Sequence, residues 1–332
     1  MIELRHDTLA FSFPEVHREA ICSISFLRTL RIPDDDREYP LPPGLGEFPL
    51  HHVDDYADRL PQRWSDHGGV FMPMYQAEAL WISFGGSYPM AVKVSAGKVD
   101  AVTGQPFSNE LHRRPQDYVV IPDQPWLDGF CVRKGLIRQF VAMPLGQGYT
   151  AEEQLTGAAE HGGLQFVVYP MKASRYERLM AERVRDPYEI DAICCSALPD
   201  SEMGLAPGGM MRQEVYSDDY GFSAWERDVR SRCFVHLLNS GQYRTVTGYA
   251  PPHEPPTAAD YTDAGLPWFE YFDADLQALE GAPRLDRLDS VGARRVKVGK
   301  PPLDHGENVE PDSKQIERLR KSHLVRDGSA AW

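Results

Sequence analysis

The chain has 332 residues, 42% of them hydrophobic and 11% aromatic, which is enough to bury one large core or two ordinary ones. Its net charge of −14 at neutral pH disfavours nucleic-acid binding, because a phosphate backbone would be repelled. The sequence contains neither an uncharged apolar run of about 18 residues nor an apolar leader of the secretory type, so we expect no membrane association.

Most apolar runs are short, rich in β-branched or aromatic residues and bounded by Gly, Pro or Asp, which is typical of strands. We expect strands at 9–13, 21–27, 69–72, 90–94, 118–121, 130–132, 136–142, 164–169, 211–216 and 233–238. The clearest hairpin joins 130–132 to 136–142 through Arg133-Lys134-Gly135, because a short glycine-containing link lets two strands pair antiparallel.

Few segments have a helical pattern. The strongest is 173–185, which ends before Asp186-Pro187, and shorter helices are expected at 75–82, 151–154 and 314–323. Strands without a regular β-α-β alternation predict a strand-rich α+β fold with antiparallel or mixed sheets and few short helices.

The tetrad of an acidic residue followed by His-Gly-Gly occurs twice, as Asp66-His67-Gly68-Gly69 and Glu160-His161-Gly162-Gly163, and each copy leads into an apolar run that ends in Pro-Met. The shared order suggests an internal repeat. In one interpretation the glycines supply positive φ at a tight turn and the imidazole caps it. In the other, His67 and His161 face one cleft and act on a ligand near neutral pH. We favour the first.

Composition divides the chain into three parts. Residues 1–250 form a globular body, with two similar halves at 1–110 and 111–250, and the Pro-rich and aromatic segment 251–281 packs back on it. Residues 282–332 form a charged C-terminal arm with 11 Lys or Arg and eight Asp or Glu. We expect this arm to dock on its own chain or on a second copy, giving a homo-oligomer. The expected anchors are Val296, Leu303, Ile316, Leu319 and Trp332.

The common cofactor and metal motifs are missing from the sequence, which has no P-loop, no dinucleotide-binding glycine pattern, no nucleophile elbow and no zinc or calcium motif. We therefore expect no cofactor and no metal. Cys233 and His236 lie in a continuously apolar run and are interpreted as a core thiol and a hydrogen-bonded core imidazole. Five cysteines, including the adjacent Cys194 and Cys195, favour a reducing compartment and a cytoplasmic protein.

Trp126 and Trp268 each follow a proline and precede a carboxylate by two residues. Such tryptophans bind sugars or cations or, more commonly, anchor loops in the core. The sequence favours a soluble binding or assembly protein with no identifiable catalytic motif, whose small-molecule ligand it does not name. The alternative is a cofactor-independent hydrolase or lyase acting on a small polar or carbohydrate-like substrate. That enzyme would use His67 or His161 as base and Asp128 or Glu78 as acid.

Overall fold

The structure is a computed structural model that describes residues 1–35, 37–182, 202–251, 254–263, 267–301, 303 and 316–319. Strands make up 39% of it and helices 17%, and most strand pairs are antiparallel, so the prediction of a strand-rich fold with few short helices is confirmed. Among the described residues no helix is long and apolar enough to cross a membrane.

The first layer is an antiparallel run of β1 (Ile2–Arg5), β2 (Thr8–Ser12), β3 (Ile21–Thr29) and β8 (Ala79–Gly85). In β3 buried and part-exposed residues alternate, because apolar side chains such as Ile24 and Phe26 point into the core while the other face meets solvent. Two short strands, β5 (Gly44–Glu47) and β12 (Trp126–Leu127), pair along β3 and β8 respectively.

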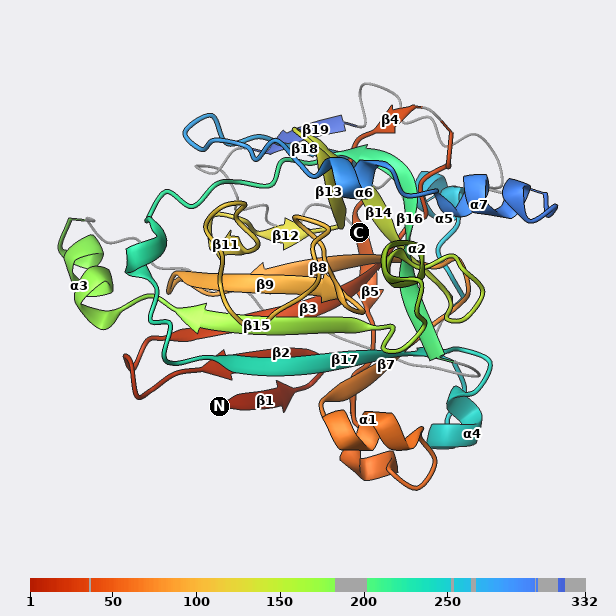
Figure 1. Cartoon of the computed structure of the whole chain (residues 1–332), viewed down its shortest axis with the longest axis horizontal. Coiled ribbons are helices and arrows are strands. Elements are labelled where there is room, and N and C mark those ends of the chain that lie inside the picture. Colours follow the sequence, from red (N-terminus) through yellow and green to blue (C-terminus); the bar gives the residue numbers. More distant parts are fainter. Residues whose placement is uncertain are drawn as a thin grey trace.

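The second layer contains β9 (Met90–Ala96), β15 (Leu164–Pro170) and β17 (Ser231–Asn239), which lie side by side and antiparallel, followed by β7 (Val70–Met74), which is parallel to β17 (Figure 1). Smaller strands border this layer: β6 (His51–His52), β10 (Val99–Asp100) and β11 (Val119–Ile121). All seven residues of β15 are buried, as expected for a strand that is covered on both faces.

Two long strands join the layers. β14 (Leu136–Pro144) pairs with β8 in the first layer and with β16 (Glu202–Arg212), and β16 continues to β17 in the second layer. The expected hairpin is present, since β13 (Gly129–Arg133) turns back on β14. The core lies between the layers, where the rings of Phe26 and Phe166 meet edge to face at 5.7 Å. β4 (Glu38–Tyr39) runs parallel to β16.

Helices lie around the rim of the sheets (Figure 1). Trp64 of α1 (Gln62–His67) and Tyr243 of α4 (Tyr243–Thr247) share a small apolar cluster, and Thr150 caps α2 (Ala151–Thr156) in a capping box with Glu153. The remaining elements are η1 (Asp54–Tyr56), α3 (Ala173–Glu182), η2 (Phe222–Ala224), α5 (Ala258–Asp263), β18 (Trp268–Tyr271), α6 (Pro283–Asp286), α7 (Val291–Lys297) and β19 (Ile316–Leu319).

Three expected elements differ from the structure. The helix expected at 75–82 is wrong. These residues form a turn and the start of β8, in which the alternating Leu80, Ile82 and Phe84 face the core. In 314–323 the described residues, Ile316–Leu319, form a strand parallel to β18. The strand expected at 211–216 ends at Arg212. The helix expected at 173–185 is described as far as Glu182, and its last residues lie outside the described part.

The segments that follow the two tetrads are both strands, as predicted. Their partners differ in direction, since β7 is parallel to β17 and β15 is antiparallel to it. The division into two similar halves stays a prediction.

The C-terminal segment contacts the body through residues in and beside α6 and α7. Leu285, Leu288 and Val291 are buried, and Leu303 and Ile316 pack partly against the core. Val296 is 60% exposed, so its expected role as an anchor is wrong: it lies on the outer side of α7. Leu319 is half-buried in β19, and Trp332 lies outside the described residues.

Candidate functional site

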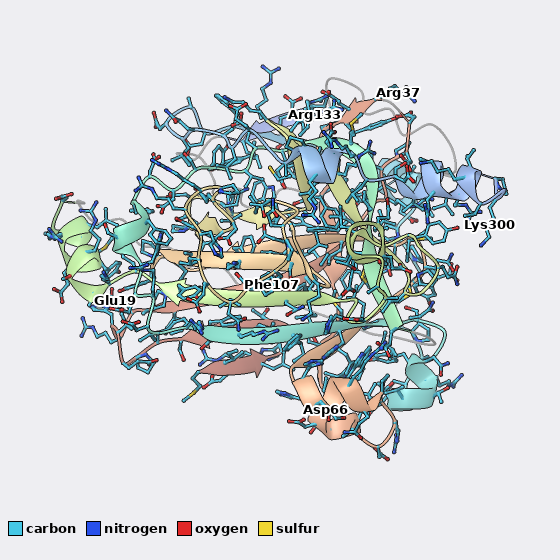
Figure 2. All side chains as sticks on the ribbon, in the orientation of Figure 1. Glu19, Arg37, Asp66, Phe107, Arg133 and Lys300 are labelled. Carbon is cyan, nitrogen blue, oxygen red and sulfur yellow. The ribbon has the colours of Figure 1, made fainter. Side chains whose placement is uncertain are left out.

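The structure brings the two predicted histidines together. Strands β7 and β15 begin on opposite edges of β17, since Val70 and Leu164 both pair with Val235. The preceding turns therefore meet, and the rings of His67 and His161 make an edge contact with 5.7 Å between their centroids. Figure 2 shows the neighbouring Asp66 on α1, at the outer surface of the molecule.

A third imidazole lies beside this pair. His236 on β17 stacks on Trp64 at 4.5 Å, and its Nε2 donates to the carbonyl of Gly68 at 3.1 Å. Burial lowers the pKa of His236 to about 4, and burial together with nearby Lys98 lowers the pKa of His161. Both rings are therefore neutral at pH 7, and His236 is the hydrogen-bonded core histidine expected from the sequence.

The space at these imidazoles is small. The cavity lined by His67, His161 and His236 measures about 10 Å³, room for at most one water molecule. The tetrad carboxylates do not orient the rings, because Asp66 accepts a bond from Gln62 and Glu160 lies 3.7 Å from His161 Nε2. A substrate does not fit in this space.

The turn amides of the second tetrad already have a partner. Buried Glu152 of α2 accepts bonds from the backbone N–H of His161, at 3.3 Å, and of Gly162, at 2.8 Å. Burial raises the pKa of Glu152 while these two bonds oppose that rise. The amides therefore fix the turn and are not presented to a ligand.

The two predicted acids lie elsewhere, in the interior. Glu78 forms a buried ion pair with Arg28 at 3.0 Å and accepts the backbone N–H of Tyr75 at 2.8 Å. Burial raises the pKa of Glu78 to about 7, although Arg28 opposes the rise. Asp128 exchanges two 3.0 Å bonds with Gln213. Neither carboxylate lines the cavity at His67 and His161, so the expected pairing of base and acid is not formed.

The two predicted tryptophans pack against other aromatic rings. Trp268 is 5% exposed and contacts Tyr261 at 6.3 Å. Trp126 is half-buried between Trp81 and Tyr271, at 5.7 and 5.1 Å. These contacts are those of loop anchors, the more common of the two interpretations.

A much larger cavity, about 1120 Å³, lies between the body and the segment that carries α6 and α7. One wall is made by 102–105 and 115–116, the second by the α2 helix, and the third by residues between Leu279 and Lys297. Its apolar lining includes Val102, Leu155, Leu279, Ala282 and Leu288. No local sequence pattern predicts this groove, because its walls come from four separate segments of the chain.

The groove is rich in cations. Arg284, Arg287, Arg294 and Lys297 line it together with the carboxylates of Glu153, Glu280 and Asp289.

All three carboxylates are engaged. Glu153 accepts three bonds at the start of α2, Glu280 pairs with Lys134, and Asp289 pairs with Lys297 at 2.5 Å and with Arg294 at 3.6 Å. Exposed Arg284 and Arg287 have no carboxylate partner among the residues that the structure describes. The groove therefore presents, beside an apolar surface, two guanidinium groups that have no carboxylate partner among the described residues, although Arg284 donates a hydrogen bond to the Gln105 side chain at 3.4 Å.

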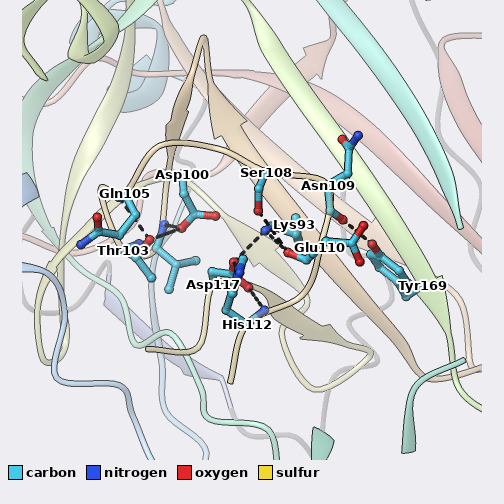
Figure 3. Close-up of polar contacts among 11 residues, drawn as sticks. Lys93, Asp100, Thr103, Gln105, Ser108, Asn109, Glu110, His112, Asp117 and Tyr169 are labelled. Carbon is cyan, nitrogen blue, oxygen red and sulfur yellow. Dashed lines mark hydrogen bonds and ion pairs between the residues drawn. The ribbon is translucent and has the colours of Figure 1, made fainter. Parts of the chain in front are cut away.

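A buried polar network holds one wall of the groove (Figure 3). Lys93, 1% exposed, donates to Asp117 at 2.6 Å and to the Glu110 carbonyl at 2.5 Å, and His112 Nδ1 donates to the same Asp117 oxygen at 2.6 Å. At the other end of this segment Asp100 accepts the N–H and hydroxyl of Thr103, at 2.8 and 2.9 Å. The segment from 100 to 117 is thus fastened at both ends.

The described residues contain no group of three or more His, Cys, Asp or Glu that could hold a metal ion. Cys22, Cys131 and Cys233 are free and buried, and Cys194 and Cys195 lie outside the described residues. The chain matches no known protein family, and no curated protein or solved structure is detectably similar to it.

Proposed function

We propose that this protein binds a small organic anion, a carboxylate or phosphate compound with an apolar part, in the groove between the body and α6 and α7. The observation that carries the proposal is a pair of guanidinium groups, Arg284 and Arg287, that line a cavity of about 1120 Å³ and have no carboxylate partner in the described part of the chain. Guanidinium groups bind carboxylates and phosphates through paired N–H donors, which favours an anionic ligand.

The groove also fits the rest of such a ligand. Its volume suits a drug-sized molecule, and its apolar lining, including Val102 and Leu288, would cover the uncharged part. The chain as a whole carries a net charge of −14, so a local cluster of cations is the one kind of surface that would attract an anion to it.

The alternative of a hydrolase or lyase has less support. The cavity at His67 and His161 accepts at most one water, and Glu78 and Asp128 lie apart from it. A binding protein without catalysis is the simpler reading of the geometry. Three free, buried thiols are consistent with a reducing compartment, and we propose the cytoplasm as the site of action.

The test is thermal melting with a panel of probes: inorganic phosphate, glutarate and octanoate. We expect octanoate, which has both an anionic and an apolar part, to raise the melting temperature most, and calorimetry then gives its affinity. Arg284→Ala and Arg287→Ala should each weaken binding about tenfold. Arg244→Ala, which removes an exposed cation on α4 outside the groove, is the matched control and should bind normally.

If none of the probes binds, or if the two groove variants and the Arg244 control bind equally, the proposal is wrong. If Arg284→Ala and Arg287→Ala lose binding while their melting temperatures without ligand equal that of the wild type, the effect is on recognition and not on folding.

A further inference from the structure

Strand β1 forms an open edge of the first layer. It pairs with β2 through four residue pairs, from Ile2↔Phe11 to Arg5↔Thr8, and no other strand in the described part of the chain shares a residue register with it. Figure 1 shows β1 beside β2 at the margin of the molecule. An open edge presents unpaired backbone groups and is a template for another strand.

The hydrogen bonds to β2 identify which backbone groups are left over. Met1 and Ser12 exchange two bonds, at 2.7 and 2.9 Å. In an antiparallel ladder bonded and non-bonded pairs alternate, so Glu3 and Arg5 also bond to β2. The N–H and C=O groups of Ile2 and Leu4 therefore point away from β2, toward the open edge.

The side chains of this strand are self-complementary. Glu3 and Arg5 lie on the outer face with side chains 43% and 63% exposed, and they pair with each other at 2.6 Å. If a second β1 lies antiparallel with Leu4 opposite Leu4, Glu3 of each copy lies opposite Arg5 of the other. The same arrangement makes the two Leu4 residues a hydrogen-bonded pair, which is the pair whose backbone groups are free.

The competing register is disfavoured by charge. Centring the pair on Glu3 would also use the free groups of Ile2 and Leu4, but it would place the two Glu3 carboxylates directly opposite each other. The usual protections of an edge strand are also weak here. β1 has no proline, its pairing with β2 has no bulge, and no charge points inward, so the protections left are its short length and the charges of Glu3 and Arg5, which the register centred on Leu4 pairs with each other.

We infer that two copies of this chain associate through β1, with a twofold axis at Leu4, so that the first layers of both copies form one continuous sheet. The partner is a second copy of the chain because β1 is complementary to itself. A partner strand must place an acid opposite Arg5, a base opposite Glu3 and free backbone groups between them, and an antiparallel β1 does all three. The association is independent of the groove proposed above, which lies at α6 and α7.

Sedimentation velocity over a range of concentrations from micromolar to millimolar tests the dimer. We expect the wild type to pass from monomer to dimer. Glu3→Arg and Arg5→Glu should each weaken the dimer by about tenfold or more, because each places like charges opposite each other. The double variant Glu3→Arg/Arg5→Glu should restore it. Arg18→Glu, an exposed charge change outside β1, is the control and should dimerise normally.

Cross-linking tests the register. Bonded antiparallel partners have Cα atoms about 5.5 Å apart, within the range of a disulfide, so Leu4→Cys should form a covalent dimer under mild oxidation. Glu3→Cys should not. A wild type that stays monomeric at every concentration overturns the inference, as does a double variant that is no better than the single ones. A Glu3→Cys dimer without a Leu4→Cys dimer overturns the register. Unchanged thermal melting of the variants shows that each has folded.

Discussion

Replacing Asp128 by Asn should make the protein more stable at pH 8 than the wild type. Asp128 is fully buried between β12 and β13. One carboxylate oxygen accepts a bond from Gln213, and the other has no hydrogen-bond partner within the described part of the chain. Burial raises the pKa of this carboxyl from 3.8 to about 7, and the bond from Gln213 only partly opposes the rise.

The size of the effect follows from that shift. A shift of about three pH units corresponds to about 4 kcal/mol, since one unit is worth about 1.4 kcal/mol. Between pH 4 and pH 7 the unfolded chain loses its proton first, so the folded state is progressively destabilised as the pH rises. Above pH 7 the full cost is present. Asn keeps an oxygen for Gln213 and removes the ionisable group, so the advantage of the variant should grow over this range and then level off.

Urea unfolding at a series of pH values from 4 to 8 measures this difference. The free energy of unfolding of Asp128→Asn, minus that of the wild type, should rise by about 4 kcal/mol across the series. Asp66→Asn, on the exposed side of α1, should run parallel to the wild type. If the curve for Asp128→Asn also runs parallel, or if the variant is less stable at pH 8 than at pH 4 relative to the wild type, the carboxyl is not held neutral by burial.

Three further predictions follow from burial. Glu78→Ala leaves Arg28 buried without its partner and should lower the free energy of unfolding by about 3–5 kcal/mol in urea; a loss below about 1 kcal/mol would show that the pair is hydrated. Trp268→Ala should cost about 3–5 kcal/mol, more than Trp126→Ala, because Trp126 is only partly buried, and equal losses on thermal melting would contradict this. Truncation after Gly281 removes buried Leu285 and Val291, so it should lower the melting temperature, while light scattering should give the same number of subunits as for the full chain. An unchanged melting temperature would mean that these contacts are not needed by the body.

Local patterns predicted the strands well where one face meets solvent or where an apolar run is bounded by glycine and proline. The hairpin at Arg133-Lys134-Gly135 is an example, because its turn and both of its strands lie next to one another in the sequence. The helix expected at 75–82 is wrong because Ala79, Leu80 and Trp81 fit a helix as well as a strand. The segment becomes a strand because it pairs with β3, about 50 residues earlier in the chain. A local sequence pattern carries no information about that distant partner.

Less of the candidate site could be predicted from the sequence. The groove depends on which carboxylates pair with which cations and on three walls from distant parts of the chain, and contacts such as Gln154 with the Asp289 backbone join residues 135 positions apart. The contact between His67 and His161 could be predicted, because the repeated tetrad suggested that the two histidines face each other. The interior positions of Glu78 and Asp128 could not be predicted, because charged residues are seldom buried and their partners Arg28 and Gln213 are far away in the sequence.

The two glycine pairs explain why the tetrads resemble each other. Gly69 and Gly163 have φ of +91° and +58°, a region that strongly favours glycine. A Cβ on Gly69 would lie 2.3 Å from the carbonyl oxygen of Phe234, and one on Gly163 would lie 2.6 Å from that of Val235. Both turns press against the same stretch of β17 from its two edges, so both need a glycine there. This contact accounts for Gly69 and Gly163, the second glycine of each tetrad, and the division of the chain into two similar halves stays a prediction.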